Sequence, residues 1–89
     1  MPASSEVRVA LPAAVALHAR PAANFVKAAM RFRSHVLVGA NGRVADAKSI
    51  LAVLSLGAKG GTTLELSADG DDAPAALDAL AELVSGLVE

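Results

Sequence analysis

The chain has 89 residues, of which 54% are hydrophobic and 19% charged, a composition that favours one compact globular domain over a disordered chain. A domain of this size has a small core, so we expect a functional site on its surface rather than a deep substrate pocket. The net charge of −1 and the absence of Trp and Tyr argue against a nucleic-acid-binding protein, and the absence of cysteine excludes disulfides and a thiol nucleophile and argues against a zinc site.

The first half of the chain is predicted to form a strand, a helix and a β-hairpin. Apolar and polar residues alternate over residues 6–11, which is the period of two expected of a strand with one solvent-exposed face. Residues 21–32 carry a helical stripe of apolar side chains. Residues 35–40 and 43–46 are predicted to pair as antiparallel strands, because Asn41-Gly42 between them suits a type I′ turn, which needs positive φ at both central positions.

The second half is predicted to add a helix, a strand and a final helix. Residues 48–56 are apolar on every side, and Gly57 supplies a helix C-cap. Residues 62–68 alternate again, and an aspartate in 71–72 can cap the last helix over residues 73–87. The order β-α-β-β-α-β-α predicts an α+β domain in which three helices cover one face of a four-stranded, mainly antiparallel sheet.

Four residues that could form a reactive site, His18 to Pro21, lie where a loop enters the first helix. Proline suits a first helical turn, so His18 is the expected N-cap, and the amides of Ala19 and Arg20 are available to bind an anion. Arg20 adds a permanent cation well shaped for phosphate oxygens. A neutral imidazole ring has a lone pair that can attack phosphorus. One interpretation of His18 is therefore a phosphorylatable histidine, and the other is a surface or capping residue.

The other polar residues predict no cofactor and no metal site. His35 stands at the edge of a predicted strand with no second ligand nearby, so we interpret it as structural. No segment approaches the ~18 consecutive apolar residues of a membrane span. The first six residues lack the basic and apolar parts of a signal peptide. We therefore expect a cytoplasmic protein with a single domain over residues 1–89.

Residues 17–22, Leu-His-Ala-Arg-Pro-Ala, resemble the active-site signature of HPr, the histidine-containing phosphocarrier family of the bacterial phosphoenolpyruvate-dependent sugar phosphotransferase system. Further motifs fall at matching spacings from residue 6 to residue 88: Asn41-Gly42-Arg43, Ala47-Lys48-Ser49-Ile50, Leu56-Gly57 and Gly61-Thr62. The resemblance implies an open-faced β-sandwich with strand order 1-4-2-3. It also implies that phospho-enzyme I phosphorylates His18 at Nδ1, that Arg20 accompanies the phosphate, and that EIIA components of sugar permeases receive it.

The resemblance extends to a second phosphorylation site and breaks at two residues. Ser49 matches the site that an HPr kinase/phosphorylase modifies in many Gram-positive members, and its other interpretation is a serine N-cap. Ala16 stands where the family usually has glycine, and Val15 where a polar residue is common. If the loop needs positive φ at Ala16, alanine costs ~1 kcal/mol or the loop takes another path. Val15 removes a side-chain hydrogen bond near the phosphate.

The second predicted helix is expected to bind a partner protein. A helix that is apolar all round has no second layer to cover it in a domain this small. With Val53 and Leu56 turned to the core, the outward face consists of Ile50, Leu51 and Leu54. Such an exposed apolar patch commonly marks a protein interface. The alternative is that these residues are more deeply buried.

We therefore predict a monomeric phosphocarrier, not an enzyme, that neither binds nucleic acid nor inserts into a membrane. A paralogue serving a nitrogen-related or fructose-specific branch is one alternative. Another is a regulatory binding module on the same fold, although HPr-like proteins of that kind lack the histidine. A small hydrolase would need a second catalytic group beside His18, and the neighbouring loop offers no Asp, Glu, Ser or Cys.

Overall fold

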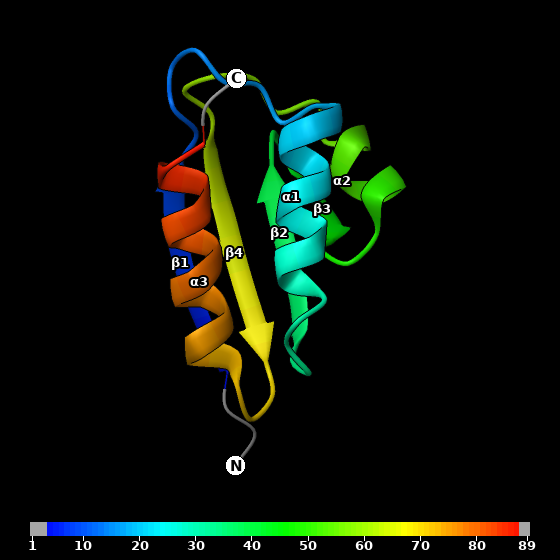
Figure 1. Ribbon diagram of the computed structural model, residues 1–89, viewed down its shortest axis with the longest axis vertical. Helices are drawn as coiled ribbons and strands as arrows, with labels where there is room; N and C mark the ends of the chain where they lie inside the picture. Colours follow the sequence, from blue (N-terminus) through cyan, green and yellow to red (C-terminus); the bar gives the residue numbers. More distant parts are fainter. Residues whose placement is uncertain (1–3, 88–89) are drawn as a thin grey trace.

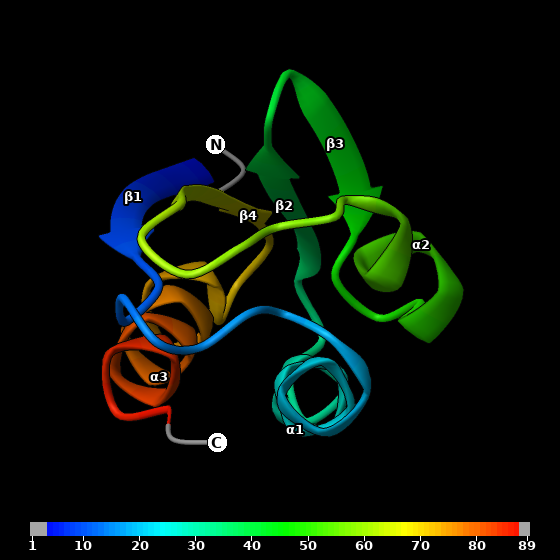
Figure 2. The same cartoon turned by 90° about the horizontal axis from the view of Figure 1, so that it is seen from above.

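The computed structural model describes residues 4–87 and has the predicted element order (Figure 1). The elements are β1 Ser4–Ala10, α1 Ala19–Ala29, β2 His35–Ala40, β3 Arg43–Asp46, α2 Ile50–Ser55, β4 Thr63–Asp69 and α3 Ala73–Ser85. The strands form one sheet in the order β1-β4-β2-β3, and every neighbouring pair is antiparallel. Seen from above, the helices all lie on one side of this sheet (Figure 2). The predicted α+β open-faced sandwich is confirmed.

The sheet is buried on its helix side because its strands alternate as predicted. In β1, Val7 and Val9 pack against the core, whereas Arg8 between them is exposed. In β4, Leu64 and Leu66 are fully buried on the same side. The helices complete a single core, whose largest buried side chains are Phe25, Leu11, Leu64, Leu66 and Leu80.

The β2–β3 hairpin has the predicted bounds. Asn41 has φ 55° and Gly42 has φ 76°, as a type I′ turn requires. Glycine has no Cβ to oppose this conformation, and asparagine tolerates it better than most residues. Local turn chemistry therefore defines this part of the sheet.

The helices begin and end within a few residues of their predicted positions. Helix α1 starts at Ala19, directly after the expected N-cap His18 and two residues before the predicted apolar stripe. It ends at Ala29, after which Arg31 and Phe32 donate to carbonyls three residues back in tight turns. Helix α2 is shorter than the predicted 48–56, because Ser49 caps its first turn by accepting a hydrogen bond from the Ala52 amide at 3.3 Å.

The predicted capping role of the aspartate side chain before α3 is wrong. Asp72 occupies the N-cap position, and its carbonyl accepts the first helical bond from Ala76 at 2.9 Å. Its carboxylate makes no capping bond. It accepts hydrogen bonds from the backbone amides of Arg33 and Ser34, each at 2.9 Å, and from the Ser34 hydroxyl. The side chain therefore joins the start of α3 to the segment before β2.

Candidate functional site

His18 lies at the N-cap of α1 with its ring exposed. Its backbone is extended, with φ −109° and ψ −163°, and its carbonyl accepts the first helical hydrogen bond from Ala22 at 2.8 Å. Within residues 4–87, the ring makes no capping bond and takes part in no other hydrogen bond. The nitrogens of the ring are therefore accessible to a partner protein.

Two amide donors follow the histidine. The first N–H groups of a helix have no carbonyl partner within it, and Pro21 has no N–H at all. The donors of the first turn that precede the Ala22 amide are thus those of Ala19 and Arg20, and both residues are exposed. Together with the positive end of the helix dipole, these donors favour an anion beside His18. The Arg20 side chain is also exposed and adds a cation to the same turn.

The exposed turn is anchored in the core on both sides. Leu17 is 2% exposed, and its amide donates to the Ala58 carbonyl at 2.9 Å. On the other side, Pro21 is buried in the first turn of α1. Between these two anchors only His18, Ala19 and Arg20 are exposed, so the backbone that carries the histidine ring has little room to move.

The two departures from the family pattern have different outcomes. Asn41 is the only non-glycine residue with positive φ among residues 4–87, so Ala16 is not left-handed and alanine carries no such conformational cost. Val15 is 3% exposed, and its amide donates to the Pro12 carbonyl at 3.0 Å. Ala16 therefore adds no backbone strain to the loop, and the buried Val15 helps to hold it.

Gly60 supports this loop from the segment that follows α2. A Cβ on Gly60 would overlap the carbonyl oxygen of Ala13 and lie 2.7 Å from its carbonyl carbon. The two segments are also joined by backbone hydrogen bonds from Leu11 to Thr62 at 2.9 Å and from Gly61 to Leu11 at 3.1 Å. The sequence indicated only a turn at Gly60, since the close approach depends on residues almost fifty positions away.

The apolar residues of α2 are divided as predicted. Val53 and Leu56 are buried at 0% and 3% exposure, whereas Ile50, Leu51 and Leu54 are 38%, 78% and 37% exposed. We call these three exposed residues the α2 face. Figures 1 and 2 both show α2 beside α1, the helix that begins at His18.

Ser49 is a structural N-cap, one of its two predicted interpretations. Its hydroxyl oxygen accepts from Ala52, and its amide donates to the Asp46 carbonyl at 3.0 Å. The side chain is only partly buried. A phosphate on this residue would therefore stand at the start of α2, next to Ile50.

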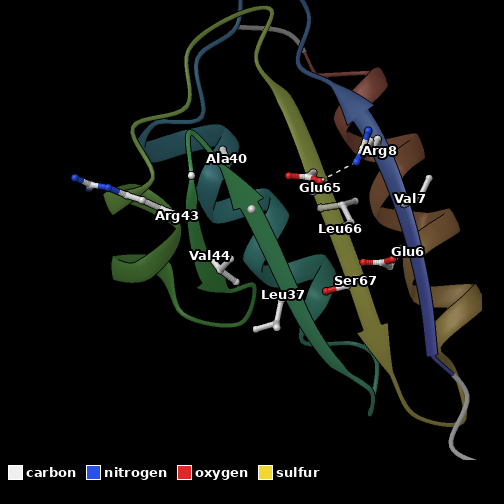
Figure 3. Close-up of a pocket in the computed structure, with 12 residues that line it drawn as sticks. Glu6, Val7, Arg8, Leu37, Ala40, Arg43, Val44, Glu65, Leu66 and Ser67 are labelled. Atoms are coloured by element: carbon white, nitrogen blue, oxygen red, sulfur yellow. Dashed lines mark ion pairs between the residues drawn. The ribbon is translucent and has the colours of Figure 1, made fainter.

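The open face of the sheet carries a concavity of about 680 Å³, which contains none of the predicted site residues (Figure 3). Arg8 and Glu65 form an ion pair there, with 3.3 Å between nitrogen and oxygen. Both side chains are exposed, and such pairs contribute little stability. The lining comes from all four strands and the hairpin turn: Glu6, Val7, Arg8, Leu37, Gly39, Ala40, Gly42, Arg43, Val44, Glu65, Leu66 and Ser67. A second concavity, between α1 and α3, also excludes His18.

Other classes of site find little support in the described part of the chain. His35 is exposed at the start of β2, opposite Asp69 of β4, and residues 4–87 contain no cluster of ligands for a metal ion. No helix among these residues has both the length and the apolar character to cross a bilayer. An exposed histidine with adjacent anion donors, outside both concavities, is the arrangement expected of a small protein that carries a group on a side chain.

Comparison with known proteins identifies the family. The family model described as "PTS HPr component phosphorylation site" matches residues 5–86. The chain belongs to the HPr family, the phosphocarrier proteins of the phosphotransferase system, and it is a carrier rather than an enzyme.

Individual relatives resemble the chain over most of its length. The phosphocarrier protein HPr of Streptomyces coelicolor is 47% identical over 87 residues, which cover 96% of this chain and 94% of the relative. The crystal structure of HPr from Bacillus anthracis superimposes with a TM-score of 0.87 at 38% identity, covering 92% of this chain and 98% of the relative. An HPr dimer from Thermoanaerobacter tengcongensis has a TM-score of 0.73 at 45% identity, covering 78% and 79%. Since this relative is a dimer, the monomeric state of our chain stays a prediction.

Proposed function

We propose that His18 is the residue that carries the phosphoryl group. Its Nδ1 accepts the group from phospho-enzyme I and passes it to EIIA components of sugar permeases. In the first transfer, the lone pair of Nδ1 forms a bond to phosphorus while the bond between phosphorus and enzyme I breaks. In the second, the new N–P bond breaks as the EIIA acceptor attacks. The observation that carries the proposal is the exposed ring at the N-cap of α1, which makes no hydrogen bond with residues 4–87.

The surroundings of His18 suit a group that must be held and then released. The Ala19 and Arg20 amides and the Arg20 guanidinium stabilise the phosphate charge without enclosing it, because both residues are exposed. Exposure keeps the stabilisation modest, since water competes for the same oxygens. A carrier needs this balance, because a tightly held group would not pass to the next protein.

The two histidines of the chain provide a direct test. Incubation with phosphoenolpyruvate and catalytic enzyme I should place an acid-labile, alkali-stable phosphate on the protein. His18→Ala should abolish the label, whereas His35→Ala should retain it. Absence of label from the wild type, or label that survives His18→Ala, would overturn the proposal.

We further propose that the α2 face docks both enzyme I and EIIA. Its support is the exposure of Ile50, Leu51 and Leu54 on a helix that lies beside the His18 helix. Exposed apolar side chains of this kind gain free energy when a partner removes them from water. Docking here would bring the partner's phosphorylated or acceptor group near α1.

We propose Ser49 as a regulatory phosphorylation site for an HPr kinase/phosphorylase. A phosphate would add about −1.5 to −2 charges next to the apolar α2 face, which opposes docking of an apolar or acidic partner surface. Ser49→Asp should keep an N-cap acceptor and weaken phosphoryl transfer from enzyme I. Ser49→Asn, which also keeps the cap but adds no charge, is the matched control, and equal transfer by both variants would contradict this role.

A further inference from the structure

Helix α2 is too short to define its own position. It has six residues, and isolated helices of this length are not stable in water. Its last turn contains no basic side chain that could bind the terminal carbonyls. The carbonyls at its C-terminal end therefore need other donors.

Each carbonyl from residue 52 to residue 56 has a donor. Local groups serve three of them: the Ser55 hydroxyl donates to Ala52 at 2.6 Å, the Leu56 amide to Val53 at 3.2 Å and the Gly57 amide to Leu54 at 3.3 Å. The last two carbonyls accept from the β2–β3 hairpin. Arg43 Nη1 donates to Ser55 at 3.1 Å, and Asn41 Nδ2 donates to Leu56 at 3.3 Å.

The hairpin turn thus acts as a C-cap for a helix that begins several residues later in the chain. Asn41 contributes in two ways. Its backbone forms the type I′ turn at φ 55°, and its side-chain amide donates to the carbonyl at the end of α2. The core holds the helix through Val53 and Leu56. Neither attachment uses a residue of the α2 face.

We propose that Asn41 and Arg43 are positioning residues that hold the α2 face in the orientation in which partners bind it. This inference rests on the proposed docking function of that face. Without the two donors, the end of α2 would fray, and a partner would have to order it on binding, which weakens affinity. The chemical step at His18 would not change.

The test uses the double variant Asn41→Gly/Arg43→Met. Glycine keeps the turn, since it adopts positive φ readily, and removes only the side-chain donor. In phosphoryl transfer from enzyme I, we expect KM for the carrier to rise roughly three- to tenfold, with kcat within about twofold. The Leu56 and Gly57 amides should exchange hydrogen faster, whereas the β4 amides should not. Arg43→Lys alone should restore most of the affinity lost in Arg43→Met.

Two controls make the outcome decisive. Arg8→Met removes the same charge from the open face of the sheet and should leave KM unchanged. An equal rise in KM for Arg8→Met would overturn the inference in favour of a general charge effect. Leu54→Glu tests the docking face itself. If Leu54→Glu raises KM but the double variant does not, the positioning role is wrong and the docking face stands. If Leu54→Glu has no effect, both proposals fail.

Discussion

The Asp72 carboxylate binds Ser34 twice, through the backbone amide at 2.9 Å and through the hydroxyl, although the residues are 38 positions apart. Together with the bond from the Arg33 amide, this contact fastens the start of α3 to the entry of β2. The hydroxyl of Ser34, followed by the Arg33 amide, lowers the pKa of Asp72 from its ordinary value of 3.8 to about 2. The ionised carboxylate is therefore the form that the fold prefers.

We expect this contact to make stability depend on pH in a defined acid range. A carboxyl group whose pKa is lower in the folded state stabilises that state fully above about pH 4 and loses this contribution as the pH falls towards 2. The urea midpoint of the wild type should therefore fall over this range more steeply than that of Asp72→Asn. Asp71→Asn, which changes the exposed neighbour, serves as the control. The same slope in the wild type and Asp72→Asn would show that the carboxylate contributes nothing.

The role of Asp72 also shows where prediction from sequence ends. Its position before Pro74 correctly marked the start of α3, because capping patterns are local. Its actual side-chain partners come from another part of the chain, and no pattern around residue 72 contains them. The hairpin at Asn41 had its bounds predicted, because its signal lies within two residues.

Part of the proposed site could likewise be predicted from local sequence patterns. Pro21 located the helix start, and the small size of the domain indicated that part of α2 stays uncovered. The strand order came only from the resemblance, since several antiparallel arrangements satisfy the same alternation. The support of the His18 loop by Gly60 was missed, because it depends on a close approach to Ala13.

Replacement of Gly60 should disturb the loop that carries His18. A Cβ there overlaps the Ala13 carbonyl, so one of the two backbone segments must move. We expect Gly60→Ala to lower the free energy of unfolding by about 1–3 kcal/mol and to shift the NMR resonances of the His18 ring. Gly86→Ala, where the nearest atom lies at an ordinary 3.5 Å, should change neither quantity. Unchanged His18 resonances in a folded Gly60→Ala variant would show that the loop is held by other contacts.

Arg20 should matter for transfer more than other cations of the same helix region. Because the Arg20 side chain is exposed, its contact with the phosphate should contribute about 0.5–1.5 kcal/mol, so Arg20→Met should reduce kcat/KM for transfer from enzyme I roughly two- to tenfold. Arg31→Met removes the same charge from the concavity between α1 and α3 and should have little effect. Equal losses in the two variants would point to overall charge rather than to contact with the phosphate.

Two matched substitutions distinguish partner binding at the α2 face from a general effect of exposed apolar side chains. Ile50 is 38% exposed on α2, and Val44 is 70% exposed on β3 at the open face of the sheet. Glutamate at Ile50 would place a charge in the proposed interface, so Ile50→Glu should raise KM for enzyme I roughly tenfold or more. Val44→Glu should leave KM unchanged. Both variants should lose less than about 1 kcal/mol of unfolding free energy, because neither side chain is in the core. Full transfer activity of a folded Ile50→Glu variant would exclude Ile50 from the docking surface, and a similar loss in Val44→Glu would place the partner on the open face instead.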